Sequence, residues 1–235
     1  MLLAFDTSSA AVTVALADPV SGAVVASSST VDALRHGELL APAIADALAS
    51  AGCKPHDLTK IAVGVGPGPF TGLRVGLVTA RTMADVLGIE VVGVCSLDIL
   101  ARQSSLTLPV AVATDARRKE IYWALYDGPA ADGSRRRLEG PAVDRPADVA
   151  HVLAGLPVIG RGAVLYAEEL RLPGAAVTTD SPGSSDAAAV VEYPSAEVLA
   201  FGVATGTLPV VAPDPLYLRR PDVTMSGGPK SVLPK

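Results

Sequence analysis

Aromatic side chains are scarce in this sequence: Phe, Tyr and Trp make up only 4% of its 235 residues, although 49% are apolar. The apolar content is mostly Ala, Val and Leu, so a core must be packed from small side chains that approach one another closely. A chain with this composition and length can bury a real core, which excludes an intrinsically disordered protein.

Long apolar runs are also missing. The apolar stretches are strand-sized and fall well short of the roughly 20 residues that cross a bilayer. The start, Met1–Asp6, lacks a basic region and reaches an acid at once, unlike a secretory signal. These features predict a cytoplasmic protein with no membrane association.

Metal ligands and nucleophile motifs are equally sparse. The two cysteines, Cys53 and Cys95, lie far apart, and the sequence has no Cys-x-x-Cys and no His-x-x-x-His spacing. No Gly-x-Ser-x-Gly elbow occurs either. We therefore expect no metal site and no catalytic residue. His36 lies just before the first expected helix and is interpreted as a residue that marks the helix boundary. The alternative is that its imidazole acts as a base or a ligand.

Positive charge is in deficit, since the formal net charge is −5. Sequence-independent binding to nucleic acid normally needs a basic face, so direct binding of nucleic acid by this chain is not expected. Two short basic runs, Arg117–Lys119 and Arg135–Arg137, are interpreted as solvated surface. The role of the loop 134–137 stays open.

Apolar periodicity predicts an α/β protein. Residues 2–5, 12–16 and 24–26 are expected to form an antiparallel meander. A helix should begin near Glu38, with Pro42 in its first turn. Residues 61–94 have the pattern of strand, glycine-rich loop, helix and parallel strand. Further strands are expected at 110–113, 121–126 and 158–159, and further helices at 163–170 and 195–205.

Two segments are candidates for contact with a nucleotide. Gly66, Gly68 and Thr71 lie in a glycine-rich loop before a helix, where backbone N–H groups can hold an anion. The loop lacks the endings of a P-loop or a dinucleotide fold, so a purely structural loop is the alternative. The Asp6-Thr7-Ser8 turn could lie near phosphates and magnesium, or form an ordinary Asx turn.

Small residues recur every four positions on both expected helices. This spacing lets helix axes approach closely, either within the lobe or between subunits, and the pattern leaves both interpretations open. The stripes are Gly72, Gly76, Ala80 and Ala84 on the second helix and Ala41, Ala45 and Ala49 on the first.

The motif Gly66-Pro67-Gly68-Pro69-Phe70-Thr71-Gly72-Leu73-Arg74-Val75-Gly76 resembles the TsaB family, the partner subunits in bacterial tRNA threonylcarbamoyladenosine synthesis. Four further segments are similar to the family in the same order. They are Phe5-Asp6-Thr7-Ser8, His36 with Leu39-Leu40, Thr114-Asp115-Ala116-Arg117, and Pro215-Leu216-Tyr217-Leu218-Arg219.

The resemblance implies a two-lobed actin-like ATPase fold of the ribonuclease H-like type. It implies an N-terminal lobe over 1–104 with the helical partner interface, a C-terminal lobe over 105–206, and a proline-rich segment over 207–235. The end of that segment, 221–235, is expected to be a mobile tail of open role. The interface residues would be His36, Leu39, Leu40, Ala43, Leu73, Gly76, Ala80 and Met83.

The resemblance also implies a non-catalytic subunit that pairs with a TsaD-like catalytic subunit and a TsaE-like ATPase. It would meet tRNA only through the complex and form a homodimer when alone. The second histidine of the metal pair expected in the catalytic relative is replaced by Leu40. No cofactor should bind tightly, although weak nucleotide binding at the complex interface stays open. The alternative hypothesis is a small-molecule kinase or ATPase of the same superfold.

Overall fold

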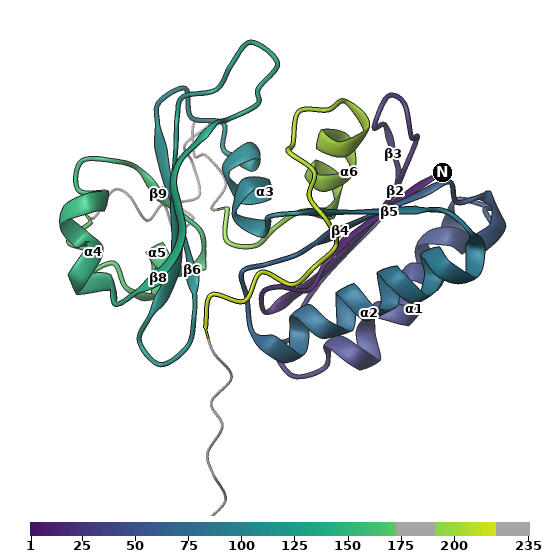
Figure 1. Ribbon diagram of the computed structural model, residues 1–235, viewed down its shortest axis with the longest axis horizontal. Coiled ribbons are helices and arrows are strands. Elements are labelled where there is room, and N and C mark those ends of the chain that lie inside the picture. The colour runs from purple at the N-terminus through teal and green to yellow at the C-terminus, as the bar shows by residue number, and fades with distance from the viewer. Residues whose placement is uncertain (173–190, 220–235) are drawn as a thin grey trace, which may run out of the picture.

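A computed structural model describes residues 1–172 and 191–219 of the chain, and the expected tail at 221–235 lies outside them. The described residues form two lobes, each built on its own sheet (Figure 1). In the first lobe the elements are β1 (Leu2–Asp6), β2 (Ala11–Ala17), β3 (Val24–Val31), α1 (His36–Ser50), a 3-10 turn (Pro55–Asp57), β4 (Lys60–Gly64), α2 (Phe70–Leu87) and β5 (Glu90–Val94).

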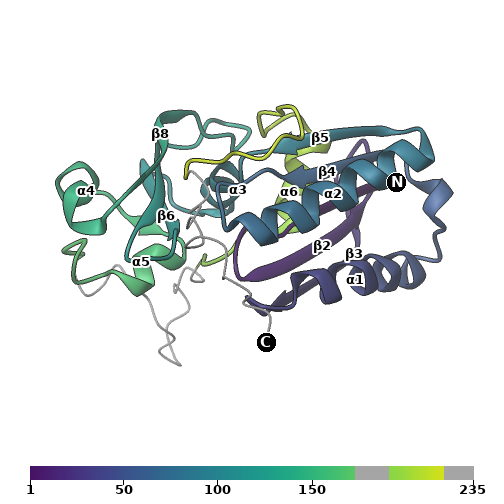
Figure 2. The ribbon, with the colours of Figure 1, turned by 60° about the horizontal axis from the view of Figure 1, so that its bottom comes forward.

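The first sheet has the order β3-β2-β1-β4-β5, with β1 parallel to β4 and β4 parallel to β5. The meander β1-β2-β3 is antiparallel, as the alternation of apolar residues predicts. Alternate residues of β1 point to opposite faces, so Leu3 and Phe5 pack under α1 and α2, whereas Leu2 and Ala4 face the other side. Figure 2 shows α1 and α2 side by side on that first face.

The second sheet has the order β8-β7-β6-β9 and is also covered on both faces. Helix α3 packs against one face through Leu97 and Leu100, while α4 and α5 pack against the other through Val149 and Ala163. The remaining elements are α3 (Ser96–Gln103), β6 (Val110–Asp115), β7 (Ile121–Tyr126), β8 (Arg137–Asp144), α4 (Pro146–Leu153), β9 (Val158–Ile159), α5 (Arg161–Leu165) and α6 (Ala196–Ala204).

Helix α6 returns to the first lobe, although its sequence position falls within the span 105–206 assigned to the second. Leu199 and Ala200 pack against Leu2 and Ala4, because the inner face of the first sheet still carries uncovered apolar side chains there. From α6 the chain crosses both lobes as an extended segment, residues 207–219, which we call the C-terminal strap (Figure 1). Among the described residues, no helix is both long and apolar enough to span a membrane.

Three differences from the sequence-based expectations have local causes. Helix α1 begins at His36 rather than Glu38, so Pro42 lies in its second turn; Pro42 and Glu38 are exposed, and water can satisfy the carbonyl that loses its N–H partner. Strand β8 gives no strand signal because it contains Gly140-Pro141, where its pairing with β7 shifts register. Helices α3 and α4 are eight residues each, too short for a clear periodic signal.

The basic run 135–137 is bound into the second lobe. Arg137 donates two hydrogen bonds to Asp98, at 3.0 and 2.7 Å, and the hydroxyl of Tyr126 donates to the same carboxylate at 2.6 Å. Arg135 donates to the carbonyls of Leu106, Leu108 and Asp127. These contacts tie α3 and the β7–β8 loop together, so two of the three arginines serve the fold.

Replacing Arg137 by Met should lower the free energy of unfolding by about 3 kcal/mol, because it leaves the buried Asp98 carboxylate without its cation. The adjacent Arg136 supplies a matched control: its pair with Asp127 is exposed, with side-chain exposures of 77% and 46%. Arg136→Met should cost no more than about 1 kcal/mol. Chemical denaturation measures both, and equal losses would contradict the structural role given to Arg137.

Candidate functional site

The turn between β1 and β2 is closed over Asp6, which is 1% exposed. Its carboxylate accepts hydrogen bonds from the Ser8 N–H and hydroxyl, both at 2.7 Å, and from the Ser96 hydroxyl at 2.5 Å. Burial raises the pKa of Asp6, while these hydrogen bonds partly oppose the rise. A Cβ at Gly64 would stand 1.7 Å from the carboxylate, so the carboxylate is enclosed on that side too.

The glycines of the 66–72 loop make room for this turn. A Cβ at Gly68 would lie 2.0 Å from the Ser8 carbonyl oxygen, and one at Gly72 would lie 2.4 Å from that of Thr7. The Thr7 hydroxyl donates to the Gly72 carbonyl at 2.8 Å. The loop therefore lies flat on the Thr7–Ser8 backbone, which favours the structural interpretation of the loop over a phosphate cradle.

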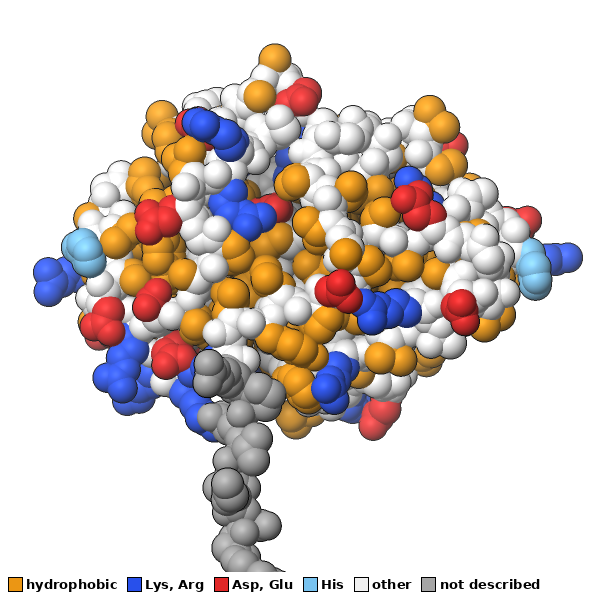
Figure 3. All heavy atoms as spheres, viewed as in Figure 1, with side chains coloured by type: hydrophobic (Ala, Val, Ile, Leu, Met, Phe, Trp, Pro, Cys, Tyr) orange, Lys and Arg blue, Asp and Glu red, His pale blue; other side chains and the backbone are white. Residues whose placement is uncertain are grey.

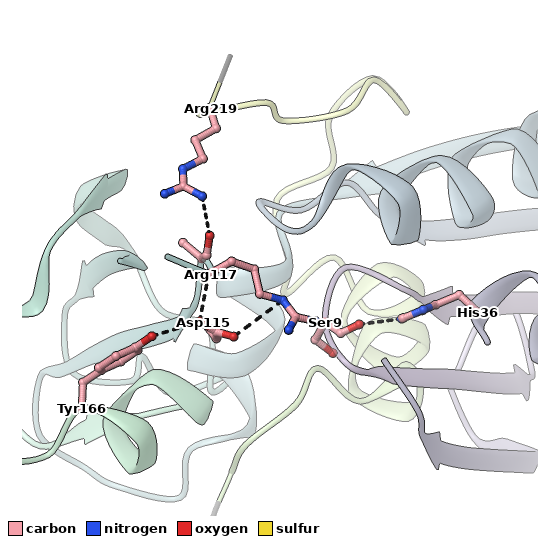
Figure 4. A network of polar contacts seen from close by, with 7 residues as sticks. Ser9, His36, Asp115, Arg117, Tyr166 and Arg219 are labelled. Carbon is pink, nitrogen blue, oxygen red and sulfur yellow. Dashed lines mark hydrogen bonds and ion pairs between the residues drawn. The ribbon is translucent and has the colours of Figure 1, made fainter. Parts of the chain in front are cut away.

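His36 begins α1 and holds the same turn from another side. It is 7% exposed, and its Nε2 lies 2.7 Å from the Ser9 carbonyl oxygen (Figure 4). This contact fits the boundary interpretation, since the imidazole is engaged with the backbone. Within the described residues, no group of three or more His, Cys, Asp or Glu side chains is placed to hold a metal ion.

A cleft of about 220 Å³ lies between the lobes, with Ser8 and Ser9 on one wall and Thr114, Asp115 and Arg117 on the other. Figure 4 shows the Arg117 side chain extending across it toward Ser9. The Thr114 hydroxyl is buried and has no hydrogen-bond partner among the described residues. The Arg117 Nε lies 3.9 Å from Asp115 Oδ2. The Arg161 Nη1, also in the cleft lining, lies 2.8 Å from Glu192 Oε2. Each of these two guanidinium groups lies beside a carboxylate, while apolar side chains such as Leu97, Leu165 and Pro194 line much of the rest of the cleft.

Of the residues predicted to approach a nucleotide, Ser8 alone lines this cleft. Thr71 is exposed at the start of α2. The others are buried behind the cleft wall, namely Asp6, Thr7, Gly66 and Gly68.

The residues predicted for the partner interface divide by burial. Leu39, Ala43 and Met83 are half-buried on α1 and α2. The small stripe of α2 faces the sheet, so its close packing is used within the lobe, whereas Ala41, Ala45 and Ala49 of α1 are exposed. The predicted interface residues that are buried inside the lobe are His36, Leu40, Leu73, Gly76 and Ala80.

Sequence reasoning missed the residues that close and line this site from the second lobe. Ser96 bridges the Asp6 carboxylate and the Gly66 N–H, which donates to its hydroxyl at 3.1 Å. Arg161 and Glu192 enter the cleft from segments with no motif. On this side of the cleft, Thr114, Asp115 and Arg117 had a signal, since all three belong to the Thr114–Arg117 motif shared with the TsaB family.

Several known proteins are similar to this chain in sequence and architecture. The chain matches, over residues 26–224, the model of the family described as TsaD, tRNA N6-adenosine threonylcarbamoyltransferase. It is 40% identical over 225 residues to an uncharacterized protein of Mycobacterium tuberculosis, covering 94% of this chain and 92% of that protein. It is 36% identical over 129 residues to the tRNA threonylcarbamoyladenosine biosynthesis protein TsaB of Bacillus subtilis, covering 53% and 54%. The structure of YeaZ from Pseudomonas aeruginosa superimposes with a TM-score of 0.69 at 31% identity, covering 92% of this chain and 99% of YeaZ.

Two lobes with a cleft between them, each lobe a mixed sheet covered by helices, define an α/β protein of the two-lobed actin-like class. Within that class the chain belongs to the TsaD family and is a TsaB-like member of it. The resemblance drawn from the Gly66–Gly76 motif is therefore confirmed.

Gly76→Ala should destabilise the fold by roughly 1–3 kcal/mol, because the new Cβ would stand 2.4 Å from the Thr7 hydroxyl. Gly37→Ala is the matched control, since a methyl group on that helical glycine would meet nothing within 4 Å. Ala is the better helix former by about 1 kcal/mol, so the control should be neutral or stabilising. Thermal unfolding compares them; equal stability of the two variants would refute the close approach of α2 to the β1–β2 turn.

Proposed function

We propose that this chain is a non-catalytic subunit in tRNA threonylcarbamoyladenosine synthesis, acting in the cytoplasm by binding and supporting a TsaD-like catalytic subunit. The single observation that carries the proposal is the outward surface of α1 and α2. The names of its relatives in Bacillus subtilis and Escherichia coli, tRNA threonylcarbamoyladenosine biosynthesis protein TsaB, support the pathway.

The outward surface of α1 and α2 combines small and β-branched side chains with charged ones, which are Glu38, Asp46, Arg74, Arg81 and Asp85. On α2, Val78 is 61% exposed and Val86 is 78% exposed. On α1 the exposed residues Ala41, Ala45 and Ala49 recur at every fourth position. Apolar side chains presented on two adjacent helices are typical of surfaces that bury themselves against another protein. The same surface would serve a homodimer when the catalytic subunit is absent.

The burial and hydrogen bonding of Asp6 favour a non-catalytic role for the chain. A carboxylate that accepts three internal hydrogen bonds and is 1% exposed is poorly placed to hold a metal–nucleotide complex. The glycine loop is likewise occupied by the Thr7–Ser8 backbone. Among the residues that the structure describes, no specific contact favours the kinase or ATPase alternative. Under the proposal, transfer chemistry belongs to the TsaD-like subunit, a TsaE-like ATPase assists it, and tRNA is engaged within the complex.

Val78→Glu should weaken association with the TsaD-like subunit at least about tenfold, because it introduces a charge into an apolar contact that must lose its water. Val20→Glu is the control, since Val20 is 80% exposed in the β2–β3 turn, away from α1 and α2. Calorimetric titration of the two subunits gives the affinities. Normal binding by the Val78 variant would remove α1 and α2 from the interface.

A further inference from the structure

Two of the few aromatic residues of this chain stack on the surface instead of in a core. The rings of Phe70, at the start of α2, and Tyr217, in the C-terminal strap, lie 5.2 Å apart at 29°. The Arg74 guanidinium lies 3.8 Å from the centre of the Phe70 ring, and its Nε donates to the Tyr217 hydroxyl at 3.3 Å. Phe70 is 40% and Tyr217 39% exposed. We call these three residues the aromatic cluster.

The strap holds Tyr217 in place from both directions. Val211 pairs with Gly93 of β5, and the Leu216 N–H donates to the Val65 carbonyl at 2.9 Å. After Tyr217, Arg219 donates to the Ala116 carbonyl at 2.9 Å and pairs with Glu120. A ring fixed in this way loses little conformational freedom when a ligand stacks on it.

The loop between β6 and β7, which Arg219 contacts at Ala116 and Glu120, carries three cationic residues in a strained backbone. Arg117, Arg118 and Lys119 have φ values of 63°, 54° and 61°, a region that side chains other than glycine rarely adopt. Asp115 helps to hold this basic turn, residues 117–119, by accepting the Arg117 N–H at 2.9 Å. Strain of this kind persists only where the surroundings enforce it, and it concentrates at functional positions.

The aromatic cluster and the basic turn are linked through the strap. Tyr217 and Arg219 are two residues apart, so their Cα atoms lie at most about 7 Å apart, and the Arg219 side chain reaches the Ala116 carbonyl beside the basic turn. Figure 3 shows basic side chains along the lower edge of the molecule on both sides of an apolar patch, with acidic side chains among them. Lys119 is exposed and forms no ion pair with another residue of the described ranges.

We propose that this surface binds RNA, with a nucleobase stacked on the aromatic cluster and phosphates at the basic turn. Unpaired bases stack on aromatic rings and arginine planes, and flanking cations neutralise the backbone. The net charge of −5 confines this attraction to the local basic turn. The inference rests on the proposed function, because tRNA is then the RNA presented, and it revises the interpretation of Arg117–Lys119 as mere solvated surface.

The test uses the complex of this chain with its TsaD-like subunit and a labelled, unmodified tRNA transcript with adenosine next to the anticodon. Fluorescence anisotropy at several salt concentrations gives Kd and its salt dependence. Arg117→Gln/Lys119→Gln should weaken binding about tenfold at low salt and reduce the log–log salt slope by about 1.4–1.8. The control pair Lys54→Gln/Arg136→Gln removes the same charge from exposed sites elsewhere and should change Kd less than about twofold.

Tyr217→Ala should weaken binding by about 5- to 10-fold with an unchanged salt slope, whereas Tyr217→Phe, which keeps the ring, should bind normally.

Size-exclusion chromatography of the same mixtures reports on subunit association. If the wild-type subunits do not associate, the proposed function fails instead. If the complex forms and both test variants bind tRNA as wild type does, the RNA surface is wrong. If they lose a protein subunit while the salt slope of the tRNA interaction is unchanged, the surface docks protein and the proposal is overturned.

Discussion

The close approach between the β1–β2 turn and the glycine-bearing start of α2 is the constraint on which the rest of the structure depends. Gly68, Gly72 and Gly76 leave just enough space for the backbone and hydroxyl of Thr7 and the carbonyl of Ser8. Beside that contact, the Asp6 carboxylate accepts a hydrogen bond from the Ser96 hydroxyl at the start of α3. Together these contacts set the position of α2, join the first lobe to α3 at the root of the second, and form one wall of the interlobe cleft.

The same contacts occupy the Asp6 carboxylate and the glycine loop, two of the features predicted to approach a nucleotide. The Asp6 carboxylate accepts three hydrogen bonds, and the backbone of Thr7 and Ser8 fills the space beside the glycine loop. These polar groups of the first lobe are therefore engaged within the fold. What this lobe presents outward is the exposed surface of α1 and α2, together with the strap that crosses both lobes. Both features suit a protein that works by contact with other macromolecules, which is the proposed role.

Much of the first lobe could be predicted, because β1, β2 and β4 are apolar segments bounded by polar or glycine-rich turns, and Gly88 ends α2 in the left-handed conformation expected of a terminator. The second lobe could be predicted in part: β6, β7 and β9 lie where strands were expected, whereas β8 is interrupted by Gly140-Pro141 and α3 and α4 are too short to show a period. For the site, the motifs identified the right segments, but residue types alone cannot say which way a side chain points. Spacing at every fourth residue described two stripes, and only the fold shows that the one on α2 is buried and the one on α1 exposed.

The central claim is that this chain supports a reaction whose catalytic groups belong to a partner. The most direct measurement is threonylcarbamoyl transfer to tRNA, supplied with threonylcarbamoyl-adenylate, by this chain alone, by the TsaD-like subunit alone, and by the two together. The account predicts no transfer by this chain alone and a clear gain when it is added to the TsaD-like subunit. Full activity of this chain by itself would contradict the account.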